Sequence, residues 1–300
     1  MTTTIRSCTA VGDGITGLVA SLELAKRGHE VRRASYIGDD YFPASPWVIP
    51  PTRLNQEATR GSDFVGELTS ELCDLGVEDI GIVERVQLGT AAVTLFEPLG
   101  SEPLAHSRAV IFSPAGATSS WHLVDAVDRR HVVTDSAPEA PFYQGRAVVV
   151  VGAGWRATSE AIHLSAAGAD VSIVCAGPRL EPAFLRDEFA RWPNVRVFAS
   201  AKITEAVVND EELQAVRVTM PGGRVETIPA ALVSLAERLE PSWALFGGTR
   251  PDRTSLVPPC IALAGLAAGI PDDDFGTQVE AGFALADRLH VTLLGSSDEG

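Results

Sequence analysis

Cysteine and histidine are scarce in this chain of 300 residues and are not arranged for metal or redox chemistry. The four cysteines are Cys8, Cys73, Cys175 and Cys260, and none belongs to the Cys-x-x-Cys pair that a local zinc site or redox dithiol requires. The six histidines lack the spacing of metal ligands. We therefore expect small buried cysteines that act as hydrophobic residues, and no bound metal.

Basic charge and long apolar runs are also lacking. The chain has 24 Lys and Arg against 39 Asp and Glu, and its net charge of −15 repels nucleic acid and anionic membrane surfaces. No apolar run reaches the roughly 18–20 residues of a membrane span. No apolar segment follows Met1 to Arg6 in the manner of a signal peptide. We expect a cytoplasmic protein that binds neither nucleic acid nor membranes.

Two glycine-rich turns dominate what the sequence does contain. Each follows a short apolar strand and precedes a helix-compatible segment, where glycines allow a tight turn and bring backbone amides close to a pyrophosphate. Glycine is also required by such a turn without any ligand, so packing alone is the alternative interpretation. The first turn contains Gly12, Gly14 and Gly17, and the second, 140 residues later, contains Gly152, Gly154 and Ala157.

The remaining periodicity predicts an α/β protein of about two domains. Apolar strands alternate with helices in both halves, and three short strands around Pro221-Gly222-Gly223 indicate an antiparallel meander. The expected helices are 18–26, 64–75, 158–167, 184–192 and 277–289, and the expected strands are 7–11, 29–34, 80–88, 92–97, 109–112, 148–151, 171–174, 194–198, 207–209, 215–220, 224–228, 232–235 and 261–264.

The order of these parts resembles that of the low-molecular-weight thioredoxin reductases, within the pyridine nucleotide-disulfide oxidoreductases, over nearly the whole chain. The resemblance implies two Rossmann-like, three-layer domains, the second inserted into the first. The segments that carry it are the two turns, the lead-in Pro141-Phe142-Tyr143-Gln144-Gly145-Arg146, the helix 61–75 and the pattern Gly265…Gln278…Ala281-Gly282.

The same resemblance implies cofactors and an assembly. An FAD-binding domain would comprise residues 1–115 and 248–300, an NAD(P)H-binding domain would comprise residues 116–247, and the protein would form a homodimer. The residues at the matching cofactor-binding positions are Gly12, Gly14, Gly17, Gly116, Gly152, Gly154, Ala157, Arg179, Gly265 and Gln278.

The redox centre of that family is missing. Its Cys-Ala-Thr-Cys-Asp segment falls on residues 135–139, which read Asp-Ser-Ala-Pro-Glu. Reduction of a disulfide needs an attacking thiolate, so we expect no thioredoxin or disulfide reductase activity. Asp135 and Glu139 become candidates for general acid–base catalysis, with a solvated loop carboxylate as the simpler interpretation of each.

Several cofactor contacts of the family are changed as well. The carboxylate that follows Gly265 in the family is Leu266 here, and no acid lies at 31–35, where dinucleotide-binding folds hold a ribose. The His-Arg-Arg that grips a 2′-phosphate is Cys-Ala-Gly at 175–177, with Arg179 nearby as a partial substitute. These changes weaken the expected binding of both cofactors.

Three functions are compatible with this pattern. The first is an FAD-dependent oxidoreductase without a dithiol that acts on a small molecule, with or without NAD(P)H. The second is a flavin-free enzyme that uses the vacated cleft for cyclisation, isomerisation or elimination, with Asp135 and Glu139 as acid and base. The third is a pseudoenzyme that binds a metabolite without turnover. The family resemblance favours the first.

Overall fold

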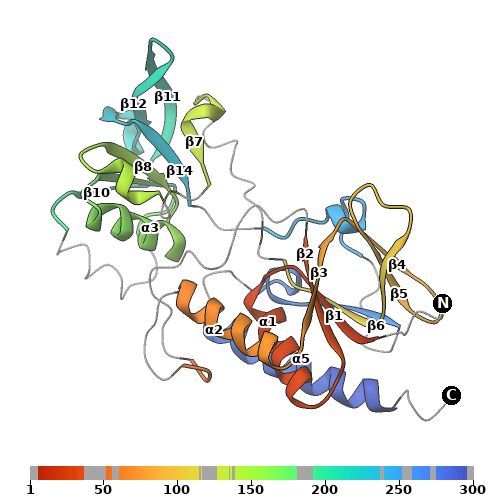
Figure 1. The fold of residues 1–300 in the computed structure, drawn as a ribbon. Helices are drawn as coiled ribbons and strands as arrows, with labels where there is room; N and C mark the ends of the chain where they lie inside the picture. Colours follow the sequence, from red (N-terminus) through yellow and green to blue (C-terminus); the bar gives the residue numbers. More distant parts are fainter. Residues whose placement is uncertain are drawn as a thin grey trace. The chain divides into compact units, whose positions relative to one another are not determined.

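The chain divides into two compact units in the structure, a computed structural model (Figure 1). Unit 1 contains the described residues up to 116 and from 240 onward, and unit 2 contains those from 127 to 236. The residues that the structure describes are 6–36, 52–55, 61–114, 116, 127–134, 136, 139–180, 192–236, 240–251, 259–270 and 275–295.

A seven-stranded sheet forms the centre of unit 1, in the order β3-β2-β1-β6-β5-β4. Strand β15 pairs with the second half of β6, while the first half of β6 pairs with β5. The four strands β2, β1, β6 and β15 are parallel, so their carboxyl ends meet at one edge. The strands are β1 (Arg6–Val11), β2 (Val31–Tyr36), β3 (Glu78–Val83), β4 (Arg85–Leu88), β5 (Val93–Phe96), β6 (Pro103–Phe112) and β15 (Cys260–Leu263).

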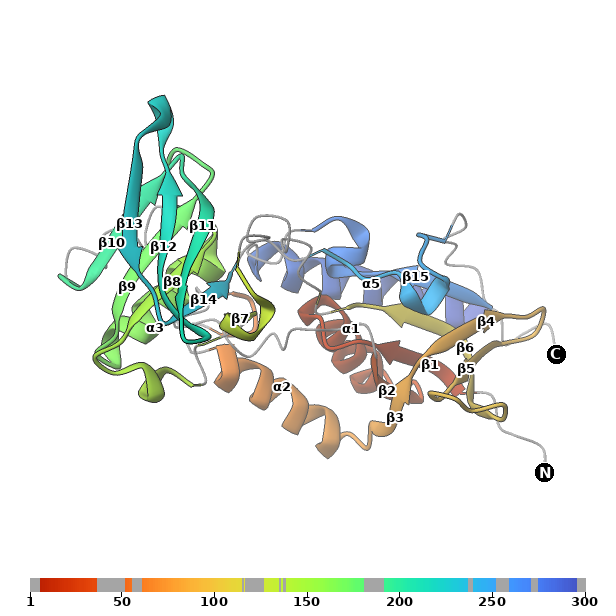
Figure 2. The same cartoon turned by 90° about the horizontal axis from the view of Figure 1, so that it is seen from above.

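Helices cover one face of this sheet. Helices α1 (Ile15–Lys26) and α5 (Phe275–Gly295) lie side by side, and α2 (Gly61–Asp74) packs beside α1 (Figure 2). Alternate residues of β1 and β6, such as Ala10 and Ile111, face α1 and α5, and their neighbours Val11 and Phe112 pack on the opposite side. Strands β4 and β5 extend the sheet from the first half of β6, and their side chains pack on this opposite side together with the short helix η5 (Ala244–Phe246). Unit 1 therefore has three layers.

Unit 2 repeats this plan on a smaller scale. Its five parallel strands have the order β10-β9-β8-β14-β7, α3 covers one face, and an antiparallel meander of β11, β12 and β13 covers the other. Near-continuous apolar strands suit a sheet that is buried on both faces. The elements are β7 (Val132–Val133), β8 (Ala147–Val151), α3 (Trp155–Ala166), β9 (Asp170–Cys175), β10 (Val195–Ala199), β11 (Lys202–Asn209), β12 (Glu212–Thr219), β13 (Val225–Pro229) and β14 (Leu232–Leu235).

The predicted fold class, with two Rossmann-like units, is confirmed, and so is the meander turned at 221–223. Several details differ, among them β7, which was not expected, and β11, which begins at Lys202 and not at 207. The strand expected at 80–88 is two strands, β3 and β4, and β6 begins six residues earlier than predicted. Residues 240–247, expected in the inserted domain, belong to unit 1 because Trp243, Leu245 and Phe246 pack in its core. The helix expected at 184–192 lies almost entirely outside the described residues.

Candidate functional site

The first glycine turn connects β1 to α1 at the carboxyl edge of the unit 1 sheet. All three of its glycines pack against Ser113, which follows β6. A Cβ on Gly12 would lie 2.6 Å from the Ser113 carbonyl oxygen, and one on Gly14 would lie 2.6 Å from Ser113 Oγ; a Cβ on Gly17 would collide with Ser113 Cβ. The Gly14 amide donates to the Ser113 carbonyl at 2.8 Å, and the Gly17 amide donates to Ser113 Oγ at 2.9 Å. The protein's own packing therefore accounts for these glycines.

The amino end of α1 remains open to an acceptor. Gly14 is its N-cap and supplies no side-chain hydrogen bond, and no acidic residue lies in the first turn. Within the described part of the chain, the amides of Ile15 and Thr16 have no acceptor. Free amides and the positive end of the helix dipole together favour an anion.

Other predicted cofactor residues gather at this helix end. Gly265 has φ +54°, and a Cβ there would lie 3.4 Å from Thr16 Oγ1. The same hydroxyl donates to the Gln278 carbonyl at 3.0 Å, which fixes the start of α5 against α1. Gly116 has φ +118° and is buried, a conformation that favours glycine. The structure thus brings Gly265 and Gln278 to the first glycine turn.

An ion pair crosses the mouth of the turn. Arg33 Nη2 on β2 lies 2.9 Å from Asp13 Oδ1, and each side chain is 16% exposed. Asp13 stands between the two leading glycines, and Arg33 lies 20 residues further on, in the region where related folds carry a ribose-binding acid. A basic residue therefore stands where that pattern has an acid. Arg33 neutralises the Asp13 carboxylate, which would otherwise repel a phosphate.

The second glycine turn, between β8 and α3, is packed in a similar way. Gly152 has φ +147°, and a Cβ there would lie 2.5 Å from the Ala236 carbonyl oxygen and 3.0 Å from Ala157 Cβ. Gly154 is the N-cap of α3, which has no acidic residue in its first turn. Arg179 follows β9 and is exposed. The turn is an amino-terminal helix site of the same kind as the first.

Similarity to solved structures identifies the fold. The crystal structure of Lactococcus lactis thioredoxin reductase matches with a TM-score of 0.80 and 14% identity, covering 97% of this chain and 99% of that chain. The T. acidophilum thioredoxin reductase matches with a TM-score of 0.78 and 17% identity, covering 95% and 98%. This is the thioredoxin reductase fold.

The thioredoxin reductase fold also matches part of a longer chain. 2-Naphthoyl-CoA reductase matches with a TM-score of 0.61 and 17% identity, covering 93% of this chain and 40% of that chain. The sequence matches no protein-family model and no curated protein. Likeness at this level establishes the fold, so the chemistry has to be argued from the site.

The segment that carries Ser136, which the family resemblance aligns with a redox dithiol, is tied to α3 by a buried carboxylate. Glu160 Oε1 accepts a hydrogen bond of 2.8 Å from the Ser136 amide and further hydrogen bonds from the hydroxyls of Ser136 and Ser234. One turn earlier, Arg156 Nη2 donates to the Thr134 carbonyl at 2.6 Å. Glu160 is 4% exposed. Sequence reasoning missed this network, although Arg156 and Glu160 stand at i, i+4 among buried alanines.

The two proposed acid–base residues have different outcomes. Asp135 lies outside the described residues. Glu139 is exposed at the start of η3 (Ala140–Tyr143), and its Oε2 accepts a hydrogen bond of 3.2 Å from Tyr143. Burial, together with this hydrogen bond, raises the pKa of Tyr143. The exposure of Glu139 is that of a solvated carboxylate, and its catalytic role stays a prediction.

No thiol pair replaces the missing dithiol. Cys8, Cys175 and Cys260 are buried and free, and Cys73 is exposed on α2. Cys8 and Cys260 both pair with Ala109 from opposite sides, two strand spacings or about 9–10 Å apart, which exceeds the Cα separation of a disulfide. In the described part of the chain, no three His, Cys, Asp or Glu side chains form a metal-binding group, and none of the helices there is long and apolar enough to cross a bilayer.

Proposed function

We propose that this protein is an FAD-dependent oxidoreductase that acts on a small molecule without a redox dithiol. The observation that carries the proposal is the open amino end of α1, where the Ile15 and Thr16 amides have no acceptor among the described residues. It lies at the carboxyl edge of a parallel sheet, the usual ligand position in such folds. The Arg33–Asp13 pair removes the charge that would oppose a pyrophosphate.

The residues present fit the phosphate part of the cofactor. The amides at the start of α1 would hold the pyrophosphate, and Gly265 and Gln278 lie beside the same helix end. A bound flavin would supply hydride transfer chemistry. In unit 2, the start of α3, which has no side-chain cap and no acid in its first turn, would bind a nicotinamide dinucleotide, with Arg179 as the nearby cation.

The absence of a dithiol supports a substrate other than a disulfide. Three of the four thiols are buried, and burial raises the pKa of Cys260 to about 11, so this thiol stays protonated at neutral pH. The neighbour named 2-naphthoyl-CoA reductase is a thioredoxin reductase-like structure whose name gives a thioester as its substrate.

Purified full-length protein tests the proposal directly. We expect absorbance near 450 nm either as isolated or after incubation with FAD and gel filtration. The coloured protein should bleach when an electron donor such as NADH or NADPH is added without oxygen. Protein that stays colourless after incubation with millimolar FAD would overturn the assignment.

A second candidate is a flavin-free protein that binds a metabolite in the same crevice. It is favoured by the contacts of Ser113 with Gly12, Gly14 and Gly17, because these glycines are needed with or without a ligand. The residue after Gly265 is Leu266, whose buried side chain cannot form a hydrogen bond with a hydroxyl. Colourless protein whose melting temperature rises with a metabolite pool, with or without turnover, would support this candidate.

A further inference from the structure

Unit 2 contains a cavity of about 540 Å³ on the side away from its glycine turn. The cavity is lined by residues that precede three parallel strands, namely His131 before β7, Arg146 before β8 and Ala231 before β14. It therefore lies at the amino edge of the five-stranded sheet. The turn at Gly152 follows the carboxyl end of β8. A ligand in this cavity would be separate from any dinucleotide at Gly152.

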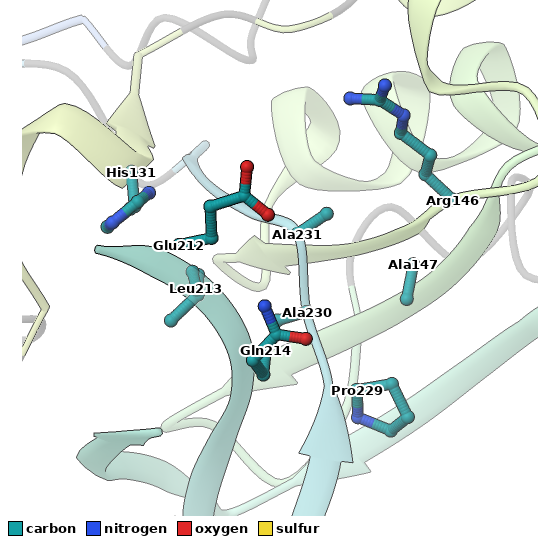
Figure 3. Close-up of a pocket in the computed structure, with 9 residues that line it drawn as sticks. All are labelled: His131, Arg146, Ala147, Glu212, Leu213, Gln214, Pro229, Ala230 and Ala231. Carbon is teal, nitrogen blue, oxygen red and sulfur yellow. The ribbon is translucent and has the colours of Figure 1, made fainter. Parts of the chain in front are cut away.

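The wall and floor of the cavity differ in chemistry. Small residues Ala147, Ala230 and Ala231 leave space in the cavity. Four polar side chains also line it, those of His131, Arg146, Glu212 and Gln214 (Figure 3). Arg146 and Glu212 are exposed, and within the described chain neither forms a salt bridge. An unpaired cation and an unpaired anion thus face one cavity without meeting each other.

Surface ion pairs join the two segments that flank this side of the cavity. Arg130 bridges Asp128 at 3.2 Å and Glu211 at 3.0 Å, which joins the loop before β7 to the turn between β11 and β12. Asp210 and Glu211 adopt φ values of 49° and 68° in that turn. Glu212 comes directly after this turn as the first residue of β12, and its side chain lines the cavity.

From this arrangement we infer that the cavity is a binding site for a zwitterion of short-peptide size. The carboxylate of the ligand contacts Arg146, its ammonium group contacts Glu212, and Gln214 bonds to a central amide. The volume falls within the range of small-molecule sites, roughly 300–1,000 Å³, and is larger than a single amino acid needs. Charge-assisted hydrogen bonds at both ends would select for a ligand that carries opposite charges at its two ends.

Glycine peptides of increasing length test the inference on the full-length protein. Calorimetric titration with diglycine, triglycine and tetraglycine should give saturable binding for at least one length, and the binding should persist in excess FAD and NADH. The N-acetylated and C-amidated forms of the best peptide should each bind about tenfold more weakly or worse, because each lacks one charged contact. Absence of saturable binding by all three peptides at 20 mM would overturn the inference.

Three variants localise the site. Arg146→Gln and Glu212→Gln should each weaken binding about tenfold, because each removes one charged partner. Arg224→Gln alters an exposed arginine of the same unit outside the cavity and should leave binding unchanged. Circular dichroism checks that all three fold. Peptide binding that is equal in the three folded variants would also overturn the inference.

Discussion

At the scale of single residues, Glu160 is the most heavily bonded carboxylate that the structure describes in unit 2. Its Oε1 accepts three hydrogen bonds, two of them from Ser136 and one from Ser234. The carboxylate is buried on α3, so water cannot replace these bonds. The network holds the segment that carries Ser136 against the parallel sheet.

We expect Glu160→Ala to lower the free energy of unfolding by about 3 kcal/mol, because three buried donors lose their acceptor. Urea unfolding followed by circular dichroism measures the change. Glu226→Gln, at an exposed ion pair, is the control and should shift stability by less than about 0.5 kcal/mol. A Glu160→Ala protein as stable as this control would show that the network contributes nothing.

A second prediction at this scale concerns Arg33 and Asp13. Arg33→Ala leaves the Asp13 carboxylate without its cation at the mouth of the turn, so FAD affinity should fall about tenfold. The double variant Arg33→Ala/Asp13→Ser removes both charges and should recover most of the affinity. Fluorescence titration measures the FAD affinity of the wild-type protein and both variants. An equal loss of affinity in the single and double variants would contradict the charge argument.

At the scale of elements, the packing of α1 on α5 depends on one glycine. A Cβ on Gly282 of α5 would lie 2.6 Å from Val19 Cβ and 2.9 Å from the Thr16 carbonyl oxygen, both on α1. Gly282→Ala should therefore cost about 2 kcal/mol through overpacking. Gly66→Ala on α2 meets no atom within 4 Å and should stabilise by about 1 kcal/mol through helix propensity. Thermal unfolding of the two variants should shift in opposite directions.

A pH-dependent contact joins the segment after α1 to α5. His29 Nε2 lies 2.8 Å from His290 Nδ1, and burial, His290 and Arg27 lower the pKa of His29 below its usual 6.5. The folded state thus binds fewer protons than the unfolded state below pH 6.5, so stability should fall as pH decreases from about 6.5 to the lowered pKa. His29→Gln should flatten this part of the stability profile measured by urea unfolding. A profile unchanged by the substitution would contradict the role of His29.

Many of the helices and strands could be predicted because the spacing of apolar residues in the sequence matches the residues that are buried in the structure. The run Val148–Val151 forms β8, and Phe64, Leu68 and Leu72 form the buried side of α2. The first half of β6 was missed because Pro103, His106 and Arg108 do not form an apolar run.

Predictability was lower for the candidate site. The glycine turns could be found from the sequence, since their spacing is local. The Glu160 network could not, because a charged residue in a helix is normally expected to face solvent, and its partners lie 24 and 74 positions away in sequence. The domain boundary was misplaced because Trp243 and Leu245 pack on β6, which is far from them in the sequence. Local sequence patterns do not show such a contact.

At the scale of the whole molecule, thiol reactivity should report the fold. Burial raises the pKa of Cys8, Cys175 and Cys260, while Cys73 is exposed. We expect one thiol per chain to react with Ellman's reagent in the native protein and four in urea. Cys73→Ser should abolish the native reaction. Rapid reaction of two thiols in native protein would contradict this arrangement and reopen a dithiol mechanism.

In both units, the first glycine of the turn packs against a backbone carbonyl at the end of a neighbouring strand. This carbonyl belongs to Ser113 in unit 1 and to Ala236 in unit 2. A side chain at either position would force two strands apart, whatever the crevice holds. A lineage that abandoned its coenzyme would still be obliged to keep these glycines in order to fold. Searches that identify dinucleotide-binding proteins by these glycines therefore detect a packing requirement of the fold. They will overstate how many such proteins bind a dinucleotide.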